Sequence, residues 1–344
     1  MPAREPHWWY GDGARWQTRA LAPLAALYGY MAQRRFLSTV PYRARCPVLC
    51  VGNFTAGGSG KTPLAIALAK RVTALGGEPW FLTRGYGGRL KGPHRVDLGT
   101  DSAVDVGDEA LLLARHAPVV IAADRAAGVR TIEASAGANA AIIMDDGLQN
   151  PTVAKDLSLA VVDFGRGFGN AHVIPAGPLR APLNFQINLV DVLVVSSVSD
   201  KGLAPGWLAV LRRARDMPCV TSVTEPVGDT SWLAGQRVVA FAGIANPERV
   251  FRMLEALGAE VVATRTFTDH AHLTAAEARA LLRLAEQQQA LLVTTEKDLV
   301  RMAGGTEGPV AELAAAARTV PIAARITGGE TEAFEALLAH ALRH

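Results

Sequence analysis

The chain is poor in cysteine, with only three among its 344 residues: Cys46, Cys50 and Cys219. Three thiols cannot build a disulfide framework, and the spacing Cys46-x3-Cys50 lacks the second pair of ligands that would complete a zinc site. These shortages exclude a disulfide-rich secreted scaffold and a zinc-ribbon protein. They favour a reducing compartment.

A net excess of positive charge is also missing from most of the chain and is found only near the N-terminus. Residues 1–45 hold seven arginines against two acidic residues, a net charge of +5, so the rest of the chain sums to −2 of the total of +3. A nucleic-acid-binding protein carries basic charge over the face that meets the phosphates. The distribution argues against a nucleic-acid partner, and it predicts that residues 1–45 meet something else that is anionic.

No long hydrophobic run accompanies this basic segment. Its apolar stretch at 20–32 contains Pro23 and Gly29 and falls short of the roughly 20 residues that span a bilayer. Apolar side chains recur there at the spacing of one helix face: Leu24, Leu27, Tyr28 and Met31. We predict an amphipathic helix that lies in a membrane interface, with arginines on anionic phosphates. Packing of this helix on the following domain is the alternative.

The clearest local pattern is a phosphate-binding loop. An apolar run at 47–53 predicts a buried strand, which leads through a glycine-rich stretch into Lys61, Thr62 and a helical segment. Backbone N–H groups of such a loop wrap a phosphate, the lysine reaches the β and γ phosphates, and the threonine hydroxyl ligates Mg²⁺. Thr55 departs from the strict pattern, which has glycine there, and a glycine-rich helix cap is the alternative. The loop glycines are Gly57, Gly58 and Gly60.

A second Mg²⁺ ligand is expected at the end of a neighbouring strand. The apolar run at 140–144 predicts a buried strand and ends in Asp145 and Asp146. This arrangement is typical of a Walker B site, in which one carboxylate lies near the metal. An ordinary turn at the end of a strand is the alternative.

Strands that alternate with helical segments predict an α/β fold with a doubly wound, mostly parallel sheet of the P-loop NTPase type. Ligands of such sheets bind beyond the carboxyl ends of the strands, where Arg84, Arg89 and Arg125 are expected. Several arginines at one sheet edge indicate a phosphorylated ligand. Asp108 precedes a helical segment at 109–116, where it is either the N-cap or a catalytic carboxylate.

A second strand-and-helix pattern begins near residue 221. It predicts a smaller α/β domain at 221–326, after a nucleotide-binding domain at 46–220, and it contains no second phosphate-binding loop. Substrate recognition or closure over the site is its expected role, and a static structural lobe is the alternative. A C-terminal helix at 327–344 is expected to pack back on the first domain.

Eight segments, in order along residues 47–301, carry a resemblance to a known family. They are VGNFTAGGSGKTP (51–63), LTRGYGGR (82–89), VGDEALLLA (106–114), DDGLQN (145–150), PAGPLR (175–180), FAGIANPERVF (241–251), FTDHAHLT (267–274) and TTEKDLVR (294–301). The set resembles the tetraacyldisaccharide 4'-kinases of lipid A biosynthesis. These enzymes use ATP to phosphorylate the 4'-hydroxyl of a lipid disaccharide 1-phosphate, and their loop also lacks the first glycine.

The resemblance implies a nucleotide site for ATP and Mg²⁺. Ser59, Lys61 and Thr62 correspond to the family's contacts with phosphate and Mg²⁺. Arg125 and Arg180 correspond to its phosphate-handling arginines.

The resemblance also implies a catalytic centre. Asp108 corresponds to the family's proposed base, and His270 of the second domain corresponds to a histidine thought to work with it. Glu109 lies beside the base and is expected near the metal, together with Asp145 and Asp146, which match the family's strand-end acids near metal and substrate. A carboxylate that accepts the proton of the attacking hydroxyl late in phosphoryl transfer agrees with this assignment.

As a member of that family the protein would act at the cytoplasmic face of a bacterial inner membrane, with the membrane surface contacted by its N-terminal helix. Two other functions compete. A P-loop GTPase is disfavoured because no N-K-x-D motif appears, and the nearest string, TEKD at 295–298, has glutamate where that motif needs lysine. A soluble kinase or ligase of the dethiobiotin synthetase type would have no use for the N-terminal segment.

Overall fold

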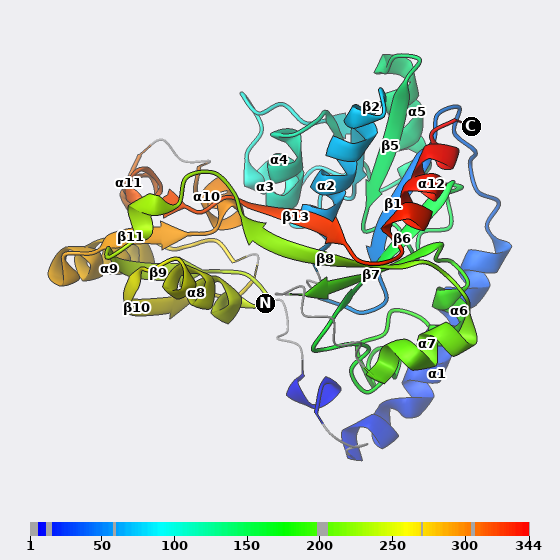
Figure 1. The fold of residues 1–344 in the computed structure, drawn as a ribbon, viewed down its shortest axis with the longest axis horizontal. Coiled ribbons are helices and arrows are strands. Elements are labelled where there is room, and N and C mark those ends of the chain that lie inside the picture. Colours follow the sequence, from blue (N-terminus) through cyan, green and yellow to red (C-terminus); the bar gives the residue numbers. More distant parts are fainter. Residues whose placement is uncertain are drawn as a thin grey trace.

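The structure, a computed structural model, describes residues 6–11, 16–57, 60–197, 206–269, 271–303 and 307–343. It consists of two lobes, each built on its own sheet (Figure 1). The larger lobe has a nine-stranded sheet with helices on both faces, and the smaller lobe, at the left of the view, has a four-stranded sheet. Within the described ranges, no helix is long and apolar enough to cross a membrane.

The large sheet has the strand order β13-β8-β7-β6-β1-β5-β2-β4-β3. Its neighbours pair in parallel, except β13 with β8 and β3 with β4. This mostly parallel, doubly wound sheet confirms the predicted fold class. The strands are β1 (Val48–Asn53), β2 (Glu78–Thr83), β3 (His94–Arg95), β4 (Val119–Ile121), β5 (Ala140–Asp145), β6 (Leu157–Asp163), β7 (Val192–Ser197), β8 (Cys219–Pro226) and β13 (Ile322–Thr327).

Strand β1 lies in the middle of the sheet, and all six of its residues are buried. Alternate side chains face opposite layers, as the strand period requires. Leu49 and Val51 pack in the core that contains helix α2 (Lys61–Ala74), whereas Val48 belongs to the core under helix α5 (Arg125–Ser135). Burying one such aliphatic side chain contributes roughly 1.5–3 kcal/mol, so these two layers fix the strand that carries the loop.

Several further helices of the larger lobe contribute side chains to the cores on its sheet. Helix α12 (Thr331–Ala341) places Phe334 and Leu338 in the same core as α2, so the C-terminal segment packs on the large sheet. The others are η1 (His7–Trp9), α1 (Trp16–Ser38), α3 (Ala103–Val106), α4 (Asp108–Ala114), α6 (Leu183–Ile187) and α7 (Gly206–Ala214).

The smaller lobe is a parallel sheet with the order β10-β9-β11-β12. Helix α8 covers one face, and α9 and α11 cover the other. Thr274 forms a capping box with Glu277 at the start of α9. The elements are η2 (Ser231–Leu233), β9 (Arg237–Ala242), α8 (Pro247–Ala256), β10 (Glu260–Thr266), α9 (Ala275–Gln288), β11 (Leu291–Thr294), α10 (Glu296–Met302), α11 (Pro309–Ala316) and β12 (Arg318–Thr319).

Two strands connect the lobes, and both belong to the large sheet. β8 pairs with β13 in antiparallel register, with Pro226 opposite Ile322 and Thr221 opposite Thr327. The domain expected at 221–326 thus includes large-sheet residues at both of its ends. A strand pattern alone does not show which sheet the strand joins, and the four-stranded sheet with its helices lies within 227–321.

Helix α1 docks on the larger lobe through small residues. Its buried residues are Thr18, Ala25 and Gly29, and a Cβ added at Gly29 would lie 3.2 Å from Cγ of Pro182. Near the helix end, Phe36 packs edge to face on a phenylalanine of α6. The apolar stripe predicted from the sequence is not part of this contact, and its four side chains are exposed: Leu24, Leu27, Tyr28 and Met31.

Candidate active site

The phosphate-binding loop runs from β1 to the first residue of α2. Gly57 and Gly60 adopt φ angles of 95° and 87°, a region that glycine enters without the strain of a side chain. α2 has no acidic residue in its first turn and no side-chain cap, so its N-terminal N–H groups and positive dipole end are available to an anion. Gly58 and Ser59, the other predicted loop contacts, lie outside the described residues.

Lys61, the first residue of α2, extends its side chain back toward the loop. Its Nζ is 3.5 Å from the carbonyl oxygen of Gly57 and 3.6 Å from Oδ1 of Asp146. The loop lysine and the strand-end acid that the sequence predicted are therefore brought together. Thr62, the predicted Mg²⁺ ligand, follows directly on the same helix turn.

Asp146 is held by cations. Nη1 of Arg180 donates to its Oδ1 at 2.7 Å, and Nε of the same arginine donates to the carbonyl of Thr55 at 3.0 Å. Although burial by itself raises the pKa of Asp146, Lys61 and Arg180 hold that pKa below its ordinary value. Arg180 therefore ties the phosphate-binding loop to the strand-end acid.

Asp145 has the opposite surroundings. It ends β5, its residue is only 1% exposed, and its Oδ1 has no hydrogen-bond partner in the part of the chain that the structure describes. Burial, followed by repulsion from Glu109, raises the pKa of this carboxyl to about 7. A buried carboxylate with an unpartnered oxygen is a suitable ligand for a divalent cation.

The predicted Mg²⁺ ligands do not form a closed metal cage. Among the residues described, no three His, Cys, Asp or Glu side chains are arranged to hold one ion by themselves. Mg²⁺ commonly takes only one or two carboxylates and completes its shell with water and substrate phosphates. The donor set around Asp145, with Thr62 at the loop, fits that mode.

Arg125 lies at the N-terminus of α5 and is 4% exposed. Its Nη1 donates to the carbonyl of Ala122, and its Nε has no partner among the described residues. Burial lowers the pKa of this guanidinium to about 10, against the opposing effect of Asp146. A buried arginine with an unsatisfied N–H at the same sheet edge fits an anionic ligand.

Asp108 is the first residue of α4 and not its N-cap, so the capping alternative is wrong. Gly107 is the N-cap, with a φ of 88° that favours glycine. Asp108 is buried, and its Oδ1 accepts the N–H of Glu109 at 2.9 Å. Its other oxygen, Oδ2, is bound by Arg301 of the second lobe.

Helix α10 of the smaller lobe contacts both acids of this pair. Arg301 donates to Oδ2 of Asp108 through Nη2 at 2.6 Å and through Nε at 3.1 Å. Lys297 lies 3.2 Å from Oε1 of Glu109 and 3.4 Å from Oδ1 of Asp269. His270, the predicted partner of the base, lies outside the described residues.

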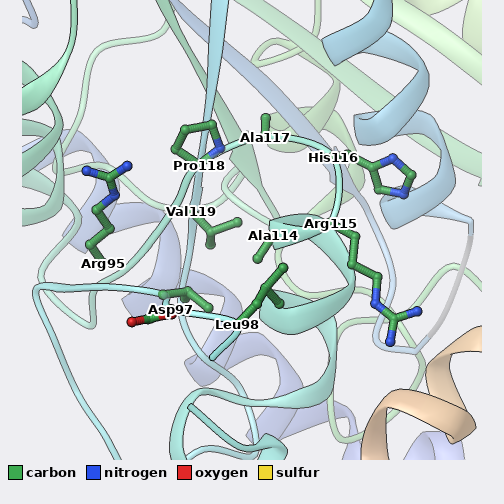
Figure 2. A pocket seen from close by; sticks show the side chains of 10 residues that line it. Arg95, Asp97, Leu98, Ala114, Arg115, His116, Ala117, Pro118 and Val119 are labelled. Carbon is green, nitrogen blue, oxygen red and sulfur yellow. The ribbon is translucent and has the colours of Figure 1, made fainter. Parts of the chain in front are cut away.

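One open pocket of the larger lobe lies away from these residues. It encloses about 730 Å³ and includes Arg95, Arg115 and His116 among the side chains that surround it in Figure 2. Val119, the first residue of β4, also lines it, so the pocket is at the amino end of that strand. The acids described above are at the opposite, carboxyl edge of the same parallel sheet.

A protein-family model described as tetraacyldisaccharide-1-P 4'-kinase matches residues 17–343. The chain belongs to this family. The tetraacyldisaccharide 4'-kinase of Methylobacterium radiotolerans is 50% identical over 299 residues, which cover 87% of this chain and 89% of that protein. That of a Bradyrhizobium strain, ORS 278, is 46% identical over 302 residues and 88% of each chain.

A solved structure has the same fold. The crystal structure of LpxK from Aquifex aeolicus in complex with ATP matches with a TM-score of 0.73, over 94% of this chain and 99% of that chain. The two sequences are 22% identical. The likeness therefore concerns the arrangement of the lobes and sheets.

Three residues of the site lie within the family segments, but the sequence by itself assigned them no role. Asn53 is fully buried at the end of β1, and its Nδ2 donates to the carbonyl of Gly57 at 3.3 Å. Lys297 and Arg301 lie in the segment TTEKDLVR, which carried the resemblance but received no role. Their spacing of four residues, which puts both on one face of a helix, was the available signal.

Proposed function

We propose that this chain is an ATP-dependent kinase that transfers the γ-phosphate to the 4'-hydroxyl of tetraacyldisaccharide 1-phosphate, a step of lipid A biosynthesis. Membership of the family over residues 17–343 supports the reaction. The structural observation that supports the reaction most directly is that Lys61 and Arg180 both form ion pairs with Asp146 beside the loop. Phosphoryl transfer depends mostly on such positioned charges.

The proposed nucleotide site is the loop and the arginines around it. Backbone N–H groups of the loop and the N-terminus of α2 would bind the phosphates, with Lys61 on the β and γ groups. Arg125 and Arg180 would neutralise further phosphate charge. The loop residues concerned are Gly57, Gly58, Ser59 and Gly60.

Asp145 and Thr62 would hold Mg²⁺, with Glu109 close enough to influence the pKa of Asp145. Asp145 is the better ligand of the adjacent pair, since Asp146 is already occupied by Arg180. When bound, Mg²⁺ would neutralise charge on the phosphates. The protein would contribute Oδ1 of Asp145, a buried carboxylate oxygen to which no described residue donates a hydrogen bond.

Asp108 is proposed as the base that accepts the proton of the attacking 4'-hydroxyl, with His270 as its partner. Its place at the start of α4, where the two lobes meet, would let both lobes surround the acceptor. A carboxylate that acts as the base needs correct placement more than strong basicity, because proton transfer is late in such reactions.

Helix α1 is proposed to rest on the cytoplasmic surface of a bacterial inner membrane. Its exposed apolar stripe and neighbouring arginines are the features that an interfacial helix presents to headgroups. This placement would bring a membrane-embedded acceptor to the enzyme.

The deciding experiment is transfer of label from [γ-³²P]ATP to tetraacyldisaccharide 1-phosphate in mixed micelles with Mg²⁺. A lipid with one added phosphate is expected, and an acceptor without the 4'-hydroxyl should stay unlabelled. Turnover of GTP without lipid, and no lipid product from ATP, would overturn the proposal in favour of a nucleotide switch. Lys70→Ala, an exposed lysine on α2, is the matched control for Lys61→Ala.

A further inference from the structure

Arg301 forms a buried ion pair between the two lobes. Its side chain is 4% exposed and that of Asp108 is 5% exposed, and two of its nitrogens converge on a single carboxylate oxygen, Oδ2. Removing two charges from water costs several kcal/mol each, which the pair must regain through close geometry. A pair of this kind fixes the direction of the carboxylate far more strictly than an exposed one does.

Arg301 is itself held on its other side. Its Nη1 donates to Oδ1 of Asp298 at 2.9 Å and to the carbonyls of Gly243 and Ala271 at 3.3 and 3.4 Å. Asp298 accepts the N–H of Gly243 at 3.1 Å and the hydroxyl of Thr295 at 2.6 Å. The guanidinium therefore donates to Asp108 of the larger lobe on one side and to groups of its own lobe on the other. These hydrogen bonds fix the plane of the guanidinium before any substrate binds.

The same helix holds the neighbouring acid. Lys297 and Arg301 are four residues apart on α10, so they share one face, and they contact the consecutive residues Glu109 and Asp108. Lys297 also reaches Asp269, and Arg301 reaches Ala271, on the loop that follows β10. One helix turn thus connects this loop of the smaller lobe to the acids of the larger lobe.

We propose that Arg301 is a positioning residue for phosphoryl transfer: it holds Asp108 by Oδ2 in the orientation in which this carboxylate meets the acceptor hydroxyl. Asp298 supports it by fixing the guanidinium. The proposal rests on the proposed role of Asp108 as base. Displacement of a catalytic group by about 1 Å costs on the order of 100-fold in rate, so loss of this contact should lower kcat strongly.

A double-mutant cycle separates this role from simple attachment of the lobes. Labelled lipid is measured for the wild type, Arg301→Gln, Asp108→Asn and the double variant, with KM for ATP and for lipid. We expect Arg301→Gln to lower kcat about 100-fold with both KM values changed less than threefold. In the Asp108→Asn background, the same substitution should lower kcat less than threefold, because the group that it positions is already gone.

Two further variants keep the test open if Arg301→Gln does not fold, as judged by circular dichroism. Arg301→Lys retains the charge but loses the forked geometry, and Asp298→Asn leaves Arg301 in place with weaker support. Both should lower kcat in the wild-type background and have little effect beside Asp108→Asn. Arg325→Gln, which breaks the arginine–glutamate pair with Glu225 on β8, is the control and should leave kcat unchanged.

Three outcomes would overturn the proposal. One is an equal loss of kcat from Arg301→Gln with and without Asp108. Another is a raised KM with unchanged kcat, which would mark a docking contact. The third is full activity of Asp108→Asn, which would remove the base that Arg301 positions. A wild-type protein that transfers no phosphate to the lipid would instead refute the proposed function, so the two failures are distinguishable.

Discussion

Asp145 and Asp146 are consecutive in the chain, yet their carboxylates have opposite electrostatic environments. Asp146 pairs with Arg180 at 2.7 Å, whereas Asp145 is buried with an unpartnered Oδ1 in the described structure. The separation arises because β5 ends at Asp145 and Asp146 adopts a φ of 56°, which turns the chain. Asp146 is thus paired with a fixed cation, whereas Asp145 has an oxygen without a hydrogen bond among the described residues.

The first prediction concerns Asp145→Asn and pH. Between the ordinary pKa of 3.8 and the raised value of about 7, the folded protein keeps a proton that the unfolded chain has released. The free energy of unfolding of the wild type therefore falls as pH rises through this window, and the amide removes that loss. Urea titrations should show the variant to be more stable by roughly 1–4 kcal/mol at pH 8, and by less at pH 5.

The same variant should have little kinase activity at either pH, because an amide is a poor replacement for the anionic Mg²⁺ ligand that we propose at this position. Asp146→Asn is the matched comparison. It removes an acid whose pKa is lowered by Lys61 and Arg180, so it should destabilise the protein at neutral pH. An equal stability change for Asp145→Asn at pH 5 and pH 8 would contradict the assigned environment.

The second prediction is that Lys61→Ala lowers kcat by a factor equivalent to about 3 kcal/mol, the typical effect of losing a preorganised donor. Lys61 lies beside Asp146 at the loop, and no other described lysine replaces it there. The measurement is steady-state transfer of label to lipid. Lys70→Ala on the same helix should behave like the wild type, and an equal loss in both variants would point to damage to α2.

The third prediction concerns Arg180→Gln. Because Arg180 joins the carbonyl of Thr55 to Asp146, its loss should loosen the loop and weaken ATP binding by about tenfold, the 1.4 kcal/mol expected for a charge-assisted contact. Calorimetric titration with ATP measures the affinity directly. Arg212→Gln, which removes an exposed pair with Glu330, should leave it unchanged. Unaltered affinity in Arg180→Gln would exclude a nucleotide role for this arginine.

The fourth prediction separates the two faces of α1. Replacing the exposed Leu24 and Leu27 by serine should reduce binding to vesicles that contain anionic lipid. The melting temperature should change by only a degree or so, since both residues are more than half exposed. Ala25→Leu, on the docked face, should instead destabilise by about 1–3 kcal/mol through overpacking. Sedimentation with vesicles and thermal melting provide the two readouts. Unchanged sedimentation of the serine variant would refute the membrane role.

The sequence identified those parts of the site whose chemistry is local. The strand, loop and helix around Lys61 are contiguous, and so are the strand and the acids that end it, so their patterns were sufficient. The contact of Arg301 with Asp108 joins residues 193 positions apart, and no periodicity reports such a pairing. The same limit applies to β13, whose partner strand β8 begins about a hundred residues earlier.

The apolar stripe of α1 shows a different limit. Helical spacing predicted correctly that Leu24, Leu27, Tyr28 and Met31 share a face, but spacing does not say whether that face meets protein or another medium. The docked face is made of Thr18, Ala25 and Gly29, which contribute little to an amphipathic pattern. Close packing of small residues can be recognised only when the opposing surface, here Pro182, is known.

The pairing of Pro226 with Ile322 has a consequence for how the two lobes are related. Because these residues are opposite partners in one antiparallel ladder, the chain leaves the large sheet and returns to it at the same point. The smaller lobe is thus inserted between the two strands of a hairpin. Without it, a short turn could connect β8 directly to β13, and the large sheet would keep all its strands. The parallel sheet of the smaller lobe has its own core on both faces. The inserted lobe therefore adds a second core to the protein without interrupting the hydrogen-bonded ladder of the large sheet, which is the kind of site at which domain insertions are tolerated.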